Sequence, residues 1–342
     1  MKLIVNLALL ASLAVGAAGA AVAQPYDPLP GPSPYGPDDE AGAANLLTAE
    51  RVRDAVKLVK TGKVYRLGHE YEAGMPAFPG DEGWHMSPRP VQEIGGQRIN
   101  TETFHGEIVQ LGTQFDALGH FGFLPEGASD PGGVLYYNQF TGAEVIGPDG
   151  LLARLGVEKV KPLITRGVLL DVKRYANGGK TLEAGQEVTV AMLRKTAAAE
   201  KVRIRKGDVV LIVTGWEERW SLGTNGYYLT NGDLGEPGLG LPAAKWLADR
   251  GVVCVGADNW GLDVAPPQPP PAPGVLFPVH HHLLVKSGVY MQESMKLGEL
   301  AKDLAADFRK SPSPNVYEFL YVFNPVPIKG ASGSLGAPLA IR

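Results

Sequence analysis

Strand-like and helix-like patterns alternate along the chain. Apolar runs typical of buried strands cover residues 168–172, 209–214, 252–255 and 316–323. Helical patterns cover residues 45–58, 190–201, 242–249 and 296–308. Thr48 is placed as the N-cap of the first helix, and residues 64–120 are strand-like but broken by Gly and Pro. The alternation predicts one α/β domain with a mixed β-sheet core and flanking helices.

Polar side chains recur at every second position near the end of this strand-like region. In an extended strand, Gln110, Gly112, Gln114 and Asp116 would share one face, and the opposite face would be almost wholly apolar. His120 follows after a turn, so two carboxamides, a carboxylate and an imidazole would converge beside a glycine. A half-buried strand whose polar side meets solvent would show the same alternation.

A second group of polar residues lies far downstream. Three of the seven histidines are consecutive, at 280–282, and Glu293 ends an apolar run at residues 289–291. A buried glutamate is costly unless it is paired, protonated or metal-bound. A histidine and a carboxylate from this segment, with oxygen ligands from residues 110–116, would form a mixed N/O site for a divalent cation. The histidine run read alone also fits a capping or surface feature.

Together the two segments resemble the cyclase-like metal-dependent hydrolase family, which includes bacterial kynurenine formamidase and isatin hydrolase. Its signature is H-x-G-T-H-x-D-x-P-x-H, followed far downstream by a histidine twelve residues before a glutamate. The positions that match are Gly112, Thr113, Asp116, His120, His281 and Glu293. The resemblance extends over residues 36–342 and implies the cyclase-like (swivelling β/β/α) fold.

The resemblance implies a role for each matched position. Asp116, His281 and Glu293 are the expected metal ligands, and His120 is the expected catalytic acid/base. Gln110 and Gln114 stand where the signature has histidines. A carboxamide oxygen binds transition metals more weakly than an imidazole nitrogen does, so these two are candidate but weaker ligands. We therefore expect a single divalent metal ion, Zn or Mn.

The implied reaction is hydrolysis of a carbonyl bond in a small molecule by a metal-activated water. The bond is an amide, a cyclic imide or lactam, or an ester or lactone. Candidate substrate-binding aromatic residues are Trp84, Tyr136, Tyr137, Trp216 and Trp260. Two alternatives stay open: a metal-dependent lyase or isomerase in which His120 abstracts a proton, and a catalytically inactive periplasmic binding protein of the same fold.

The N-terminus resembles a secretory signal. Lys2 precedes an apolar stretch, and Ala21-Val-Ala23 fits a small-residue cleavage site, so residues 1–23 are predicted to be a signal peptide. The protein would then be periplasmic or secreted, with no stable membrane anchor after cleavage. Residues 24–40 form a proline-rich leader, and residues 41–342 form the hydrolase domain. A second proline run, residues 266–273, fits either a motif that recruits a proline-binding module or a stiff loop at the entrance to the site, and its position favours the loop.

Composition narrows the choice of partners. The formal net charge is −4 and no basic tract is present, which argues against a nucleic-acid partner. Cys254 is the only cysteine, so an intramolecular disulfide is excluded, and its apolar surroundings predict a place in the core. The expected partners are a small-molecule substrate and further copies of the chain, as a dimer or tetramer.

Overall fold

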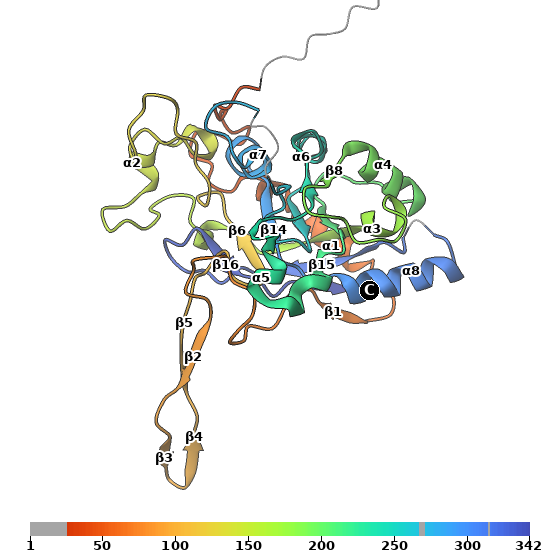
Figure 1. Ribbon diagram of the computed structural model, residues 1–342, viewed down its shortest axis with the longest axis horizontal. Coiled ribbons are helices and arrows are strands. Elements are labelled where there is room, and N and C mark those ends of the chain that lie inside the picture. The colour runs from red at the N-terminus through yellow and green to blue at the C-terminus, as the bar shows by residue number, and fades with distance from the viewer. Residues whose placement is uncertain (1–25, 267–270, 314) are drawn as a thin grey trace, which may run out of the picture.

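A computed structural model describes residues 26–266, 271–313 and 315–342, and Figure 1 shows their arrangement. The proposed signal peptide and part of the proline run at 266–273 lie outside these residues. Nine strands form one mixed sheet. In spatial order they are β1 (Val64–Arg66), β17 (Leu339–Ile341), β15 (Glu318–Phe323), β7 (Leu163–Leu170), β9 (Val209–Ile212), β13 (Cys254–Ala257), β14 (Tyr290–Glu293), β6 (Gln114–Asp116) and β16 (Gly333–Leu335).

Four parallel strands, β7, β9, β13 and β14, form the middle of the sheet, and antiparallel strands extend it on both sides. Nearly every residue of these four strands is buried, as is typical of parallel strands that are packed on both faces. Cys254 lies fully buried in β13, as its apolar neighbours predicted. The expected mixed α/β architecture is confirmed.

The α-helices are α1 (Ala49–Val56), α2 (Gly142–Val145), α3 (Val172–Tyr175), α4 (Val190–Ala199), α5 (Gly223–Tyr227), α6 (Leu241–Ala248), α7 (Pro278–His280) and α8 (Gly298–Lys310). The 3₁₀ turns are η1 (Gly42–Leu46), η2 (Tyr137–Gln139), η3 (Val157–Lys159) and η4 (Trp216–Leu222). A π-helical turn, η5 (His281–Lys286), follows α7 directly. Thr48 caps α1, because its side chain accepts a hydrogen bond from the Arg51 N–H.

The strand predicted over residues 110–116 is shorter than expected. Only β6 is extended, and Gln110 and Gly112 have positive φ angles of 64° and 62°. These left-handed residues break the alternation, so one polar face does not run from 110 to 116. All of β6 is buried because it lies between β14 and β16 inside the sheet. The prediction of a single ligand-bearing strand was therefore wrong.

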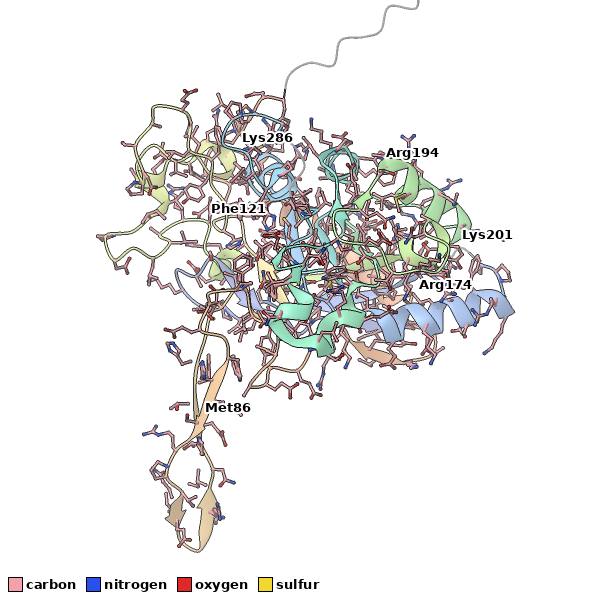
Figure 2. The ribbon with its side chains drawn as sticks, viewed as in Figure 1. Met86, Phe121, Arg174, Arg194, Lys201 and Lys286 are labelled. Atoms are coloured by element: carbon pink, nitrogen blue, oxygen red, sulfur yellow. The ribbon has the colours of Figure 1, made fainter. Side chains whose placement is uncertain are left out.

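A long hairpin arm projects from the body (Figure 1). Strand β2 (His85–Pro88) pairs with β5 (Glu102–His105), and further out β3 (Gln92–Ile94) pairs with β4 (Gln97–Ile99). Every residue of these strands is exposed, including Met86, which Figure 2 shows on the arm. Two smaller strand pairs complete the structure: β10 (Leu229–Thr230) with β11 (Asp233–Leu234), and β12 (Gly238–Leu239) with β8 (Glu187–Val188).

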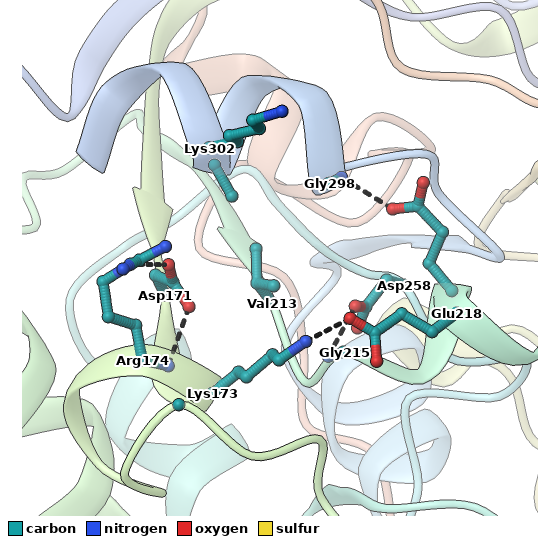
Figure 3. Close-up of a pocket in the computed structure, with 12 residues that line it drawn as sticks. Asp171, Lys173, Arg174, Val213, Gly215, Glu218, Asp258, Gly298 and Lys302 are labelled. Atoms are coloured by element: carbon teal, nitrogen blue, oxygen red, sulfur yellow. Dashed lines mark hydrogen bonds and ion pairs between the residues drawn. The ribbon is translucent and has the colours of Figure 1, made fainter. Parts of the chain in front are cut away.

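The parallel strands end at one edge of the sheet, and polar residues collect there. Asp171 follows β7, Thr214 lies beyond β9, Asp258 follows β13, and Glu293 ends β14. In sheets of this kind, ligands bind outside the carboxyl ends of the strands. A cavity of about 430 Å³ lies at this edge, bordered by Asp171, Gly215 and Asp258 and by the first turns of α8 (Figure 3). None of the helices in the described part of the chain combines the length and the apolar character that spanning a bilayer requires.

Glu217, at the rim of this cavity, is predicted to destabilise the fold when it ionises. It accepts hydrogen bonds from the Leu297 and Gly298 N–H groups at the start of α8. Burial, and then the nearby charge of Asp258, raise its pKa to about 7. Because the folded-state pKa lies above the unfolded one, its stabilising contribution is present at low pH and is lost as pH rises towards 7.

Glu217→Gln keeps a carbonyl oxygen for both N–H groups and removes the charge. We expect it to raise the free energy of unfolding by about 1–3 kcal/mol at pH 8 and by much less at pH 5, measured by urea unfolding. Glu218→Gln is the matched control, because Glu218 is exposed and pairs with Lys173. An equal effect of Glu217→Gln at both pH values would contradict the prediction.

Candidate metal centre

Four ionisable side chains from separate elements meet inside the molecule. Asp116 and Glu293 end the neighbouring strands β6 and β14, His280 ends α7, and His120 lies on the turn after β6. The His280 Nε2 atom is 3.2 Å from Glu293 Oε1 and 3.7 Å from Asp116 Oδ2. His120 Nε2 is 4.0 Å from the same Asp116 oxygen. Ligand atoms of Asp116, His120 and His280 all lie within 4.8 Å of one another.

The facing atoms of this cluster are buried and lack hydrogen-bond partners within the described structure. They are both carboxylate oxygens of Asp116, Oε1 of Glu293, and the Nε2 atoms of His120 and His280. His280 Nε2 and Glu293 Oε1 are close but poorly aligned for a hydrogen bond. Buried polar atoms are rarely left unpaired, because each loses its hydration without compensation. This set of oxygen and nitrogen donors fits a divalent cation.

His280 is held with its Nε2 atom towards the cluster. Its Nδ1 atom lies 2.7 Å from Asp263 Oδ2, and the same carboxylate accepts hydrogen bonds from the backbone N–H groups of Val279 and His280. A carboxylate behind a histidine fixes the tautomer and orientation that metal binding requires. Asp263 therefore completes a carboxylate–histidine pair aimed at the centre of the cluster.

The cluster carries more negative charge than its surroundings can easily stabilise. Burial, and then the neighbouring charge of Asp116, raise the pKa of Glu293 to about 8. Burial alone would lower the pKa of His280, but its hydrogen bond with Asp263 and the nearby carboxylate of Glu293 outweigh this and raise it well above its usual value. Burial lowers the pKa of His120, against the opposing effect of Asp116. A bound cation would offset the repulsion between the carboxylates.

The structure places His280, not His281, in the cluster, contrary to the ligand set expected from the sequence. His281 Nδ1 lies 2.7 Å from the Tyr26 hydroxyl, and its ring packs edge-on against Phe123. The spacing from the facing histidine to Glu293 is thus thirteen residues rather than twelve. A π-helical turn, His281–Lys286, lies between these positions, so counting residues along the sequence does not show which histidine faces Glu293.

Gln114 presents no free ligand atom to the cluster. Gln114 donates from Nε2 to Glu293 Oε2 at 2.7 Å, and its carbonyl oxygen accepts the Leu111 N–H. Gln114 therefore orients Glu293. Gln110 is half-exposed, and its backbone carbonyl accepts hydrogen bonds from the Phe78 N–H and the Tyr228 hydroxyl.

Of the five aromatic residues expected to bind substrate, Trp260 is tied most directly to the cluster. Its backbone N–H donates to Glu236, and the neighbouring Asn259 carbonyl accepts the N–H of Ser294, next to Glu293. The other four serve different contacts. Trp84 stacks on Phe104 at the base of the arm, Tyr136 packs beside Gly122, Tyr137 hydrogen-bonds Ser33 and Asp39, and Trp216 donates to the Tyr227 carbonyl in the core.

Three residues near the cluster were not singled out from the sequence. Asp263 lies behind His280, and the Phe121 ring lies 4.5 Å from the His280 ring. Glu236 is fully buried, and burial and then Glu293 raise its pKa well above the usual value. Only Phe121 carried a sequence signal, because it directly follows His120. Glu236 and Asp263 are brought near the cluster by bridges between distant segments, and a local sequence pattern cannot predict such bridges.

The fold and this cluster define an α/β protein with a buried candidate metal centre. Residues 65–264, more than half of the chain, match the family model described as a putative cyclase. The chain belongs to this cyclase family.

Solved structures agree with this assignment. A crystal structure described as a novel cyclase is 30% identical, with a TM-score of 0.74, and the match covers 90% of this chain and 96% of that one. Isatin hydrolase A from Labrenzia aggregata bound to benzyl benzoate is 18% identical, with a TM-score of 0.57, over 84% of this chain and 94% of that one. An isatin hydrolase bound to the product analogue thioisatinate is 17% identical, also at 0.57, over 86% and 98%. The two isatin hydrolases share the fold. A search of curated proteins found no match.

Neighbouring histidine variants test the corrected placement. His280→Ala should weaken Zn²⁺ binding by more than the 10–100-fold typical of losing an outer-sphere partner. His281→Ala removes an imidazole that faces away from the cluster, so Zn²⁺ binding should weaken far less. Isothermal titration of both variants with Zn²⁺ measures this. A larger loss in His281→Ala than in His280→Ala would contradict the placement.

Proposed function

We propose that the protein is a metal-dependent hydrolase that cleaves a carbonyl bond in a small molecule. The observation that carries the proposal is the convergence of five buried, unpartnered donor atoms from Asp116, His120, His280 and Glu293. Membership of the cyclase family and the shared fold with isatin hydrolases support hydrolysis as the reaction. The scissile bond is an amide, a cyclic imide or lactam, or an ester or lactone.

Asp116, His280 and Glu293 would hold the metal ion, Zn or Mn. When bound, a divalent cation supplies a Lewis acid that polarises a carbonyl and lowers the pKa of a coordinated water. Nδ1 of His280 pairs with Asp263 on the far side of the ring, so Nε2 faces the cluster and would bind the metal with release of its own proton. Gln114 fixes one oxygen of Glu293 and leaves the other facing the cluster.

His120 is the side chain placed to move the proton. Its side chain is 13% exposed, whereas those of Asp116, His280 and Glu293 are at most 4% exposed, so His120 borders solvent. Burial lowers its pKa, which favours the neutral imidazole, whose Nε2 would accept a proton from the attacking water. His120 would then return this proton to the leaving group.

Metal removal and isotope transfer test the reaction class. Dialysis against a chelator should abolish turnover of a panel of small amides, cyclic imides and lactones, and Zn²⁺ or Mn²⁺ should restore it. In water enriched in ¹⁸O, one heavy oxygen should enter the product, as mass spectrometry would show. Turnover without isotope entry would indicate a lyase or isomerase. Absence of bound metal in protein purified without added ions, together with no turnover, would favour the inactive binding protein.

His120→Ala should separate proton transfer from metal binding. We expect the variant to keep its metal content and to lose on the order of a hundredfold or more in kcat, the usual effect of removing a positioned acid/base group. Asp116→Ala is the comparison, because it should lose both metal and turnover. Metal analysis and steady-state kinetics measure both properties. If His120→Ala lost metal in step with activity, the result would instead indicate that His120 is a metal ligand.

We also propose that the protein works in the periplasm or outside the cell, and that it self-associates. The signal-like N-terminus supports export. The hairpin arm supports association with a second copy, because Met86, Ile94 and Phe104 on it are 61–64% exposed. A two-stranded hairpin with uncovered apolar side chains is marginally stable in water.

A further inference from the structure

We propose that the proline-rich leader is a strap that sets which histidine faces the metal centre, with Tyr26 as the positioning residue. This inference rests on the metal site assigned under the proposed function. The strap consists of residues 26–43, that is, most of the leader and the start of η1, and it runs along the segment between α7 and β14.

The first part of the strap binds both ends of the π-helical turn. The Tyr26 hydroxyl contacts His281 Nδ1 at 2.7 Å, at the start of the turn. Lys286, at its end, donates from Nζ to the carbonyls of Asp27 and Leu29 at 2.6 and 2.5 Å, and its ammonium lies 5.6 Å from the Tyr26 ring centre. Lys286 is labelled in Figure 2. The leader thus holds the turn from its first residue to its last.

The second part of the strap is anchored on η2 and on the entry to β14. Asn138 donates from its side-chain amide to the carbonyls of Gly36, Pro37 and Asp39. Tyr290 donates to the Ala41 carbonyl at 2.8 Å.

At the end of the strap, the Ala43 N–H donates to the Gly288 carbonyl at 2.8 Å. A Cβ atom at Gly42 would collide with this same carbonyl oxygen, so the backbones approach as closely as glycine allows. The strap is therefore fixed along its length and does not depend on Tyr26 alone.

The position of the strap matters because the histidine register is set by an unusual turn. Successive residues of a helix point about 100° apart, so His280 and His281 cannot face the cluster together. A π-helical turn is less stable than an α-helix and persists where other contacts hold it. Tyr26 holds the His281 imidazole away from the cluster, and Asp263 holds His280 towards it. A register shift of one residue would instead present His281, at twelve residues before Glu293.

Tyr26→Phe tests the proposal, because it keeps the ring and removes only the hydroxyl. We expect Zn²⁺ affinity to fall by up to about tenfold, because Tyr26 acts through His281 and not on a metal ligand, whose own partner is worth roughly 10–100-fold. The Tm should change little. Amide hydrogen exchange across residues 278–286 should speed up in the metal-free protein. Tyr35→Phe is the matched control in the same leader, because Tyr35 is exposed. Lys286→Met removes the hydrogen bonds between the strap and the other end of the π-helical turn. It should also lower Zn²⁺ affinity and speed up exchange.

A second arm asks whether the register itself changes. In the Tyr26→Phe background, His280→Ala should lose less Zn²⁺ affinity than it does alone, because His281 can then enter the cluster. If Tyr26→Phe changes neither the Zn²⁺ affinity nor the hydrogen exchange, the positioning role of the strap is overturned. Failure of the unmodified protein to bind Zn²⁺ would overturn the proposed function and the positioning role with it. In that case hydrogen exchange would still report whether the leader holds the turn.

Discussion

The burial of Asp116 and Glu293 on neighbouring strands is the constraint on which the site depends. Both side chains are fully buried, and one oxygen of Glu293 and both of Asp116 lack hydrogen-bond partners. Ionised carboxylates are expensive to bury unless they are paired or bind a metal. His280 lies between them, and Asp263 fixes its orientation. The arrangement is stabilised most when a cation joins the two carboxylates and the histidine.

The sheet explains how distant segments reach one place. Four parallel strands end at one edge, and β6 joins this edge as an antiparallel neighbour of β14. Asp116 and Glu293 are therefore brought together by strand pairing, while His280 arrives on a helix that leads into β14. The leader then secures this connection from outside. Backbone geometry, more than any single side chain, decides which groups meet.

Much of the fold could be predicted because apolar runs with clear ends specify it. The runs at 209–214 and 316–323 became β9 and β15, and the Thr48 cap began α1 as expected. The strand at 110–116 was overestimated, because alternation does not reveal the left-handed backbone at Gln110 and Gly112. The choice of His281 failed for a related reason, because residue counting cannot detect a π-helical turn. Asp263 is paired with His280 only through tertiary structure, so the sequence gives no local sign of its role.

A crystal structure of the metal-loaded protein, with anomalous diffraction recorded at the zinc and manganese edges, tests the central claim most directly. We expect one ion bound by His280 Nε2 and the carboxylates of Asp116 and Glu293. Gln114 should remain hydrogen-bonded to Glu293, and His281 should remain hydrogen-bonded to Tyr26. An ion held by His281, or by the oxygens of Gln110 and Gln114, would contradict it. So would a metal-soaked crystal with no anomalous peak at this cluster.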